Sequence, residues 1–514
     1  MHAIVIESPN KRALFYSALD QFYPNDFKVI ATKGRIYDLC EETNNYIPVN
    51  NSVYSYLEGE LANVDRIVIA TDNDVEGELI GYHAHTIAPQ IEYDRIIISD
   101  LDHMSLKKAF QNPVQLRTDM INEAAAKRMI DRLVGFNYSS KPNSLYPGGA
   151  TVGRVLTPTL SEVKKEGGLI GDFCITLSVN GNNIAFTSES EEGLKVLADT
   201  LKHDPCSVDV SDLINEDKVN SLANFEDLIS NVSSITQKEP VEVEAAVQKL
   251  YEEGAISYPR TISRDATPEQ VEVLKRQLFQ DTGDDTANGD HLINTNNHTH
   301  SAIIPLKGLD YRVDHNNPKT TAYGLLSRRC AIALTGKYKK KSIKLTPTPK
   351  IKTILEQFRI KTPSYIYEFT TPDERLCCTH DGNSMIFGLN TGVELGVVWP
   401  RSTQLTLLKM MSSLGIAEPS TIVTHAAKIS SKYLSNSGQI NIHGENALNH
   451  AAKVLPALLL HSTYRQLEHI LKQRDLDANQ KVLNCMSALN INTKKPSTDV
   501  REYHQENDNN TIDL

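Results

Sequence analysis

The first hundred residues alternate between short apolar runs and segments with helical spacing. Apolar runs typical of buried strands cover Ala3–Ile6, Phe27–Ala31, Arg66–Ala70 and Arg95–Ser99, and helices are predicted over Arg12–Phe22, Val75–His85 and Ser105–Phe110. This alternation indicates a parallel sheet covered by helices. Such sheets carry their chemistry at the carboxyl ends of the strands. Glu7 and Asp72 each follow a predicted strand, so we expect carboxylates to gather at one edge of this sheet.

The remainder of the chain is mainly helical in pattern. Spaced apolar residues predict helices over Met120–Tyr138, Val241–Tyr251 and Thr321–Leu334, and a largely helical region over Ser402–Lys472. Residues 170 to 235 have a mixed pattern, and Asp281–Thr299 is polar and typical of a loop. Thr346-Pro-Thr-Pro349 breaks the chain and indicates a return crossing between domains. The polar residues 491–514 predict a disordered tail.

Length and composition indicate a multi-domain globular protein. The chain has 514 residues, too many for one ordinary core, with 40% hydrophobic and 23% charged residues. No apolar run approaches the roughly 18 residues that a membrane helix needs. The N-terminus lacks the basic start and long apolar stretch of a signal peptide. We therefore expect a cytoplasmic protein without a membrane partner.

The seven cysteines do not form a recognisable framework. Their number is odd and none stands in a C-x-x-C pair. This pattern argues against disulfides and against zinc ribbons, so we expect reduced, structural cysteines and no zinc.

The charge distribution leaves a nucleic-acid partner open. The net charge of −11 counts against phosphate binding, which requires local cations. Lysines concentrate between Lys337 and Lys341 and continue to Lys352. They predict either a basic groove on an acidic body or a solvated strand or loop.

An acidic cluster follows the third predicted strand. Asp72, Asp74 and Glu76 alternate along a strand-to-helix turn. Carboxylates at this spacing suit Mg²⁺, which prefers hard oxygen ligands. The structural alternative is a helix whose acidic first turn faces solvent and complements the helix dipole. Glu7, at the end of another predicted strand, favours the metal site. Lys11 lies about one turn further on and could reach a phosphate bound at the same site.

A tyrosine and an arginine two positions apart provide the second chemical signal. Tyr258 precedes a proline, which favours an extended backbone, and Arg260 then projects to the same side. A lone tyrosine is usually a packing residue. Beside a guanidinium that neutralises a phosphate, however, a phenol is a plausible nucleophile toward phosphorus. The phosphotyrosine bond would keep the energy of the broken phosphodiester, so resealing would need no ATP.

At this point the chain resembles the type IA DNA topoisomerases, most closely the topoisomerase III branch. The motifs that carry the resemblance occur in family order and are Val5–Lys11, the acids Asp72 to Glu76, Asn122–Gly135, Val152–Leu160, Ile256–Thr261, His300–Pro305 and Glu418–Thr421. They span most of the chain, which makes chance agreement very unlikely.

The resemblance implies a role for each matching residue. It implies catalytic functions for Tyr258, Arg260, Glu7, Lys11 and His300, DNA contacts from Arg154, Arg128, Arg132, Ser420 and Thr421, and a metal site at Asp72, Asp74 and Glu76. The implied cofactor is Mg²⁺. The implied partner is DNA with single-stranded segments, negatively supercoiled or catenated, and a helicase or replication proteins are further candidates.

The resemblance also implies the architecture, a multi-domain α/β protein closed into a toroid. The expected parts are a Toprim domain with a Rossmann-like parallel sheet at 1–110, a helical DNA-binding domain at 111–170 plus 405–490, a strand-rich arch at 171–234 plus 345–404, a tyrosine domain at 235–344 and a disordered tail at 491–514.

Six positions depart from the family pattern. Val75 replaces an Arg, Arg35 a His, Leu156 a Gln and Ile262 an Asp, and Ser301 and Leu306 also diverge. The nucleophile, its arginine and the three acids remain, so we expect activity. Two alternatives stay open: a catalytically weakened relative that binds DNA or acts as a scaffold, and another Toprim enzyme such as a primase or nuclease.

Overall fold

The chain forms two compact units. The computed structural model describes residues 1–19, 26–40, 46–98, 103–169, 173–179, 182–188, 190–204, 207–212, 217–218, 221–283, 285, 287–293, 300–335, 337–362, 365–370, 379–381, 384–386 and 402–491. The first unit comprises residues 1–166, 252–254 and 440–514, and the second comprises residues 167–251 and 255–439. Each unit therefore draws on separated stretches of sequence.

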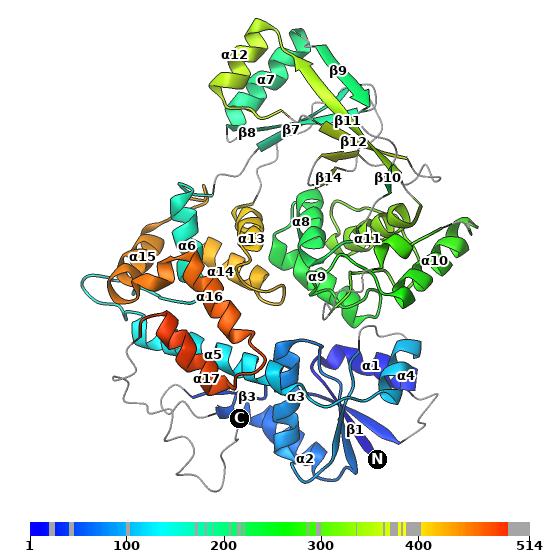
Figure 1. The fold of residues 1–514 in the computed structure, drawn as a ribbon, viewed down its shortest axis with the longest axis vertical. Coiled ribbons are helices and arrows are strands. Elements are labelled where there is room, and N and C mark those ends of the chain that lie inside the picture. Colours follow the sequence, from blue (N-terminus) through cyan, green and yellow to red (C-terminus); the bar gives the residue numbers. More distant parts are fainter. Residues whose placement is uncertain are drawn as a thin grey trace. The chain divides into compact units, whose positions relative to one another are not determined.

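The first unit begins with a four-stranded parallel sheet. Its strands are β1 (His2–Ile6), β2 (Phe27–Ala31), β5 (Arg66–Ile69) and β6 (Tyr93–Arg95), in the order β2-β1-β5-β6. In the register of the central strand, Val5 lies opposite both Ile30 and Ile69. The strands therefore end together, which brings Glu7 and the segment after Ile69 to one edge of the sheet (Figure 1).

Helices and a small hairpin complete this α/β layer. They are the 3-10 turn Pro9–Lys11, α1 (Arg12–Leu19), the hairpin β3 (Tyr37–Leu39) and β4 (Tyr46–Pro48), α2 (Asn51–Leu61), α3 (Val75–Ile87) and α4 (His103–Gln111). Apolar side chains from the strands pack against α2 and α3 in one continuous core. Helix α3, which follows the acidic turn, is therefore packed against the sheet.

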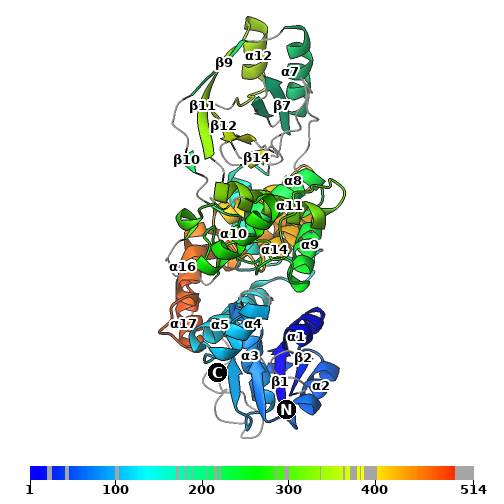
Figure 2. The ribbon, with the colours of Figure 1, turned by 90° about the vertical axis from the view of Figure 1, so that its right-hand side faces the viewer.

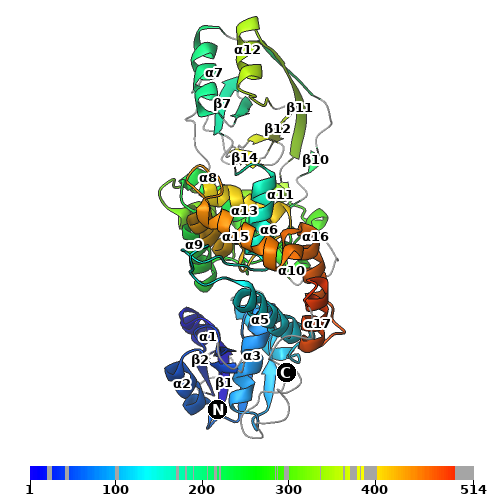
Figure 3. The same ribbon diagram turned by 90° about the vertical axis from the view of Figure 1, so that its left-hand side faces the viewer.

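A helical layer with its own core completes the first unit. Its helices are α5 (Thr118–Tyr138), α6 (Leu156–Lys165), α15 (Ile442–Val454), α16 (His461–Leu471) and α17 (Ala478–Ala488). Ile130 and Val134 of α5 share a buried cluster with Leu467 and Val482, more than three hundred positions away in the sequence. Figure 3 shows α5 beside α17 and α3, with which it is in contact.

The second unit contains a helical part built around two long helices. Its elements are α8 (Phe225–Thr236), α9 (Pro240–Glu252), α10 (Pro268–Thr282), α11 (Pro318–Thr335), α13 (Thr403–Ser413) and α14 (Ile422–Tyr433). Buried side chains of α10 and α11 share a core with Ala302 and Ile304. The extended segment that carries Tyr258 lies against this core, because Ile256 forms a bridge with Pro305.

The other part of the second unit is rich in antiparallel strands. It contains the hairpin β7 (Phe173–Val179) and β8 (Asn182–Ser188), and a sheet of β9 (Ser207–Asp212), β10 (Asp217–Lys218), β11 (Lys337–Thr346), β12 (Tyr365–Thr370), β13 (Thr379–Asp381) and β14 (Ser384–Ile386). The helices α7 (Glu191–His203) and α12 (Pro349–Gln357) lie side by side (Figure 2) and share a buried core with the β7–β8 hairpin.

Several expected elements differ from those observed. The strand expected over Arg95–Ser99 is β6 at Tyr93–Arg95, and residues 96–98 follow it outside the strand. The polar stretch predicted as a loop from Asp281 contains the end of α10 and a 3-10 turn at Asp290–Leu292, and residues 294–299 lie outside the described part of the chain. Helices α2 and α10 were not predicted.

Two predictions concern residues that the structure does not describe. Residues 492–514, expected as a disordered tail, lie outside the described residues, as do the side chains of the lysine run within β11. Among the helices of the described part, none is both long and apolar enough to cross a membrane.

Candidate active site

The acidic turn is shaped by the start of helix α3. Asp74 is the N-cap of α3, and its Oδ1 accepts a hydrogen bond of 2.7 Å from the Gly77 N–H. The turn is so tight that a Cβ atom on Gly77 would lie 2.1 Å from the carbonyl oxygen of Asp72. Glycine at this position therefore lets the backbone of the helix pack directly against the residue that carries the first acid.

Glu7 and Lys11 meet Asp72 at this edge. The Lys11 ammonium lies 2.5 Å from Oδ1 of Asp72, and both side chains are buried. Glu7 Oε1 accepts a hydrogen bond of 2.9 Å from the Asp72 N–H. Burial of the Glu7 carboxyl, with the nearby charges of Asp72 and Asp74, raises the pKa of Glu7 to about 8.

Glu76 occupies a different part of the edge. Its Oε1 lies 2.8 Å from Nε of Arg35 and 2.9 Å from Nη2 of Arg128. Asp38 joins the same group, with contacts of 2.7 Å to Arg35 and 3.2 Å to Arg128. Two arginines and two carboxylates thus form a closed ring of charges, which we call the ion-pair ring.

The oxygen donors at this edge suit a hard divalent cation. Glu7, Asp72 and Asp74 supply carboxylates close enough to affect one another's charge. In the part of the chain that the structure describes, no group of three or more potential ligands is already arranged around one point. Asp72 is held by Lys11 and Glu76 by the ion-pair ring, so cation binding requires these carboxylates to exchange partners.

A buried ion pair between Arg95 and Glu78 holds the backbone of the acidic turn. Arg95 is fully buried and donates to the carbonyl oxygens of Thr71 (2.8 Å) and Asp72 (3.0 Å). Its Nε also donates to Oε1 of the buried Glu78, at 2.9 Å. Arg117 contacts the same Glu78 oxygen at 2.6 Å. Arg95 and Glu78 were not predicted, because a buried ion pair leaves no periodic pattern in the sequence.

The candidate nucleophile lies in the second unit. Tyr258 is 4% exposed, and its ring stacks on His300 with ring centroids 4.5 Å apart. Tyr251 approaches it edge-on, with centroids at 5.5 Å. Arg260, two residues further on, faces Glu244 of α9 with a nitrogen–oxygen distance of 3.9 Å. The structure therefore brings together the predicted tyrosine and histidine, with the predicted arginine on the same extended segment.

The predicted DNA-contact residues have different environments. Arg154 is buried and forms ion pairs with Asp131, at 2.7 Å, and with Glu468. The guanidinium of Arg132 lies 4.5 Å above the ring of Phe136, whose side chain is 54% exposed. Phe136 was missed by the sequence analysis, although it lies one helical turn after Arg132.

The last predicted contact lies at a helix N-terminus. Thr421 is the exposed N-cap of α14, and Ser420 precedes it. The first backbone N–H groups of a helix and its dipole favour an anion at such a position.

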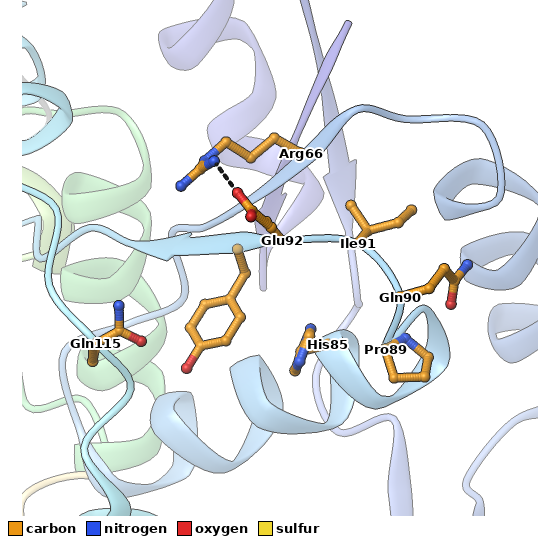
Figure 4. Close-up of a pocket in the computed structure, with 8 residues that line it drawn as sticks. Arg66, His85, Pro89, Gln90, Ile91, Glu92 and Gln115 are labelled. Carbon is orange, nitrogen blue, oxygen red and sulfur yellow. Dashed lines mark hydrogen bonds and ion pairs between the residues drawn. The ribbon is translucent and has the colours of Figure 1, made fainter.

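A pocket marks the opposite end of the N-terminal sheet. It has a volume of about 370 Å³ and is lined by Arg66, His85, Pro89, Gln90, Ile91, Glu92, Tyr93 and Gln115. Figure 4 shows Arg66 paired with Glu92 across it. Because Arg66 and Tyr93 are the first residues of β5 and β6, the pocket lies away from the acidic edge.

Comparisons with known proteins agree with this description. A DNA topoisomerase family model matches residues 115–474, and a Toprim domain model matches residues 2–101. DNA topoisomerase 1 of Helicobacter pylori is 27% identical over 334 residues, which cover 55% of this chain and 44% of that protein. DNA topoisomerase 1 of Rickettsia prowazekii is 30% identical over 179 residues, covering 31% of this chain and 23% of that protein.

A solved structure shows the same fold. Full-length topoisomerase I from Thermotoga maritima superposes with a TM-score of 0.64 at 19% identity, covering 95% of this chain and 89% of that chain. This likeness confirms the predicted multi-domain α/β fold. The chain spans less than half the length of the curated relatives it matches. Closure into a toroid, the individual domain bounds and the likeness to the topoisomerase III branch stay predictions.

The prediction that the N-terminal domain binds a metal ion is supported, and the identity of the metal stays a prediction. The N-terminal sheet belongs to the Toprim domains, which bind metal ions. The family model covers well over half of the chain and includes the tyrosine segment, His300 and the residues predicted to contact DNA. The chain therefore belongs to the type IA DNA topoisomerase family, with a Toprim domain at its N-terminal end.

Proposed function

We propose that the protein changes DNA topology by cutting one strand, passing another through the break and resealing it, without ATP. The observation that carries this proposal is the Tyr258 ring stacked on His300, in a family member that retains the acidic Toprim edge. The substrates would be negatively supercoiled or catenated DNA with single-stranded segments. We place the activity in the cytoplasm on the nucleoid, with a helicase or replication proteins as partners.

The cleavage step uses the tyrosine as a nucleophile. The phenolic oxygen of Tyr258 attacks a backbone phosphorus, releases its proton to water and forms a bond to the 5′ phosphate. The bond from phosphorus to the 3′ oxygen breaks, and that oxygen takes a proton from Glu7 or Lys11. Arg260 and His300 stabilise the negative charge on the pentacoordinate phosphate. Resealing reverses these bond changes, which is why no external energy source is needed.

The metal would act at the 3′ end of the cut strand. We assign it as Mg²⁺, held by the carboxylates of Asp72, Asp74 and Glu76 with Glu7 adjacent. When bound, Mg²⁺ supplies charge that holds the 3′ end in line for resealing. The carboxylates fit this role because they are hard oxygen donors on one turn, and the support from Arg95 keeps that turn in place.

The strand itself would be held by a separate set of residues. Arg128 and Arg132 on α5 offer charge to the backbone, and the exposed ring of Phe136 offers a surface on which a base can stack. Ser420 and Thr421 offer the N-terminus of α14 to a phosphate. Arg154 would have to exchange Asp131 or Glu468 for DNA, since both carboxylates hold it here.

A relaxation assay tests the proposal. Negatively supercoiled plasmid is incubated with the protein and Mg²⁺ in the absence of ATP, and topoisomers are separated on a gel. The expected result is a ladder of relaxed forms with the native protein and none with Tyr258→Phe. A protein that binds the plasmid but never changes its linking number would instead be the weakened relative.

A further inference from the structure

We propose that Arg35 is a further DNA-backbone-binding residue, which holds a phosphate at the acidic edge of the Toprim domain. This inference rests on the proposed function and deepens it.

The turn before Arg35 is fixed to the catalytic strand end. Lys33 and Gly34 have φ angles of 58° and 99°, so the chain reverses through two left-handed residues directly after β2. The Lys33 N–H donates to the Glu7 carbonyl at 2.9 Å, and the Ile36 carbonyl accepts from the Val49 N–H at 2.9 Å. The position of Arg35 is therefore set by the backbone on both sides.

Arg35 is the solvent-facing cation of the ion-pair ring. Its side chain is 41% exposed, whereas that of Arg128 is 16% exposed. Nε and Nη1 are engaged by Glu76 and Asp38, which orient the plane of the guanidinium. Within the described ranges, Nη2 of Arg35 has no hydrogen-bond partner. A fixed guanidinium with a remaining donor is suited to a phosphate oxygen.

The balance of charge gives this cation an electrostatic role. The edge carries the carboxylates of Glu7, Asp38, Asp72, Asp74 and Glu76, and ion pairs join three of these to the cations Lys11, Arg35 and Arg128. A DNA backbone approaching this edge is repelled by the acids. Val75, at the start of α3, adds no charge because its side chain packs against an apolar cluster that includes Leu79. Arg35 is the most exposed of the three cations.

Arg66 offers a matched control in the same domain. It also lies between two carboxylates, Glu92 and Asp94, and its side chain is 35% exposed. It lies at the start of β5, beside the pocket of Figure 4 and away from the acidic edge. Arg66→Gln therefore removes the same charge from a similar environment without altering the proposed site.

The test measures binding without chemistry. Tyr258→Phe protein is titrated with a labelled single-stranded oligonucleotide in EDTA over a range of salt concentrations. Loss of one phosphate contact reduces the slope of log K against log salt by about 0.7 for single strands. We expect this reduction, with weaker binding at low salt, in Arg35→Gln. Arg35→Lys, which keeps the charge, should retain most of the slope, and Arg66→Gln should match the parent.

Two outcomes would overturn the inference: an unchanged slope in Arg35→Gln, or equal reductions in Arg35→Gln and Arg66→Gln. Either result leaves the proposed function standing if the native protein relaxes plasmid. Conversely, failure of the native protein to relax plasmid would refute the proposed function whatever the slopes show.

Discussion

At the scale of single residues, the site combines groups that sequence can identify with groups that only packing reveals. The tyrosine, its arginine and the acids stand in short motifs, so the resemblance was enough to select them. Arg95 and Glu78 were missed because a buried ion pair leaves no periodic signal in the sequence. Their role follows from hydrogen bonds to the carbonyl oxygens of Thr71 and Asp72, which no motif records.

His83 is a buried group whose titration should affect stability. It lies on α3 with its ring near those of Tyr37 and Tyr46, at centroid distances of 5.2 and 5.3 Å. Burial, and then the charge of Arg128, lowers the pKa of His83 to about 3. Between this value and the ordinary pKa of about 6.5, the unfolded chain binds one more proton than the folded chain. The free energy of unfolding should therefore fall as the pH falls through this window.

The corresponding variant is His83→Phe, which keeps an aromatic ring but removes the proton site. The native protein should lose up to about 1.4 kcal/mol per pH unit more than this variant between pH 6 and pH 4. Thermal unfolding followed at each pH measures the difference, with His469→Phe on the exposed face of α16 as the control. Identical pH dependence in the native protein and His83→Phe would show that His83 is not the responsible group.

At the scale of elements, the alternation of apolar runs and helices predicted the sheet well. Strand β2 was predicted with its observed bounds, and β1 and β5 to within one residue, because buried parallel strands are continuous apolar runs. The strand expected from Arg95 was displaced because Arg95 is paired within the interior rather than exposed at a boundary. Helix α10 begins with a capping box at Thr267 and Gln270, a signal that was present in the sequence but not used.

Gly77 gives a test of how the acidic turn is built. Gly77→Ala would place a Cβ atom 2.1 Å from the Asp72 carbonyl, so the backbone must move. We expect a loss of about 1–3 kcal/mol in the free energy of unfolding, typical of overpacking. Gly59→Ala in α2 meets nothing within 4 Å and should stabilise the same domain by about 0.5–1 kcal/mol.

Denaturant unfolding of the two glycine variants measures both effects in the same domain. The informative result is a lower free energy of unfolding in Gly77→Ala and a higher one in Gly59→Ala. A neutral Gly77→Ala would mean that the turn does not need the close approach seen here.

At the scale of the whole molecule, the tyrosine and the acids belong to different compact units of the chain. The sequence could not specify their arrangement, because contacts between distant segments leave no local pattern. The resemblance supplied the expected architecture instead. The proposed cycle uses groups from both units, Tyr258 for cleavage and the acids for resealing.

Removing the metal site should separate the two halves of this cycle. In Asp72→Ala plus Asp74→Ala, cleavage by Tyr258 retains its nucleophile, but the 3′ end is no longer held for resealing. Broken DNA should accumulate and plasmid relaxation should fall by at least about tenfold, which corresponds to 1.4 kcal/mol. Chelation of Mg²⁺ from the native protein should reproduce the effect. Full relaxation by the double variant would remove these acids from the mechanism.

The most direct test of the central claim is to trap the covalent intermediate. The protein is incubated with labelled single-stranded DNA, quenched with detergent, and separated on a denaturing gel, and the labelled peptide is then sequenced. We predict a protein–DNA adduct whose 5′ phosphate is linked to Tyr258 and which is lost in Tyr258→Phe. An adduct that persists in Tyr258→Phe, or that maps to another residue, would contradict the account.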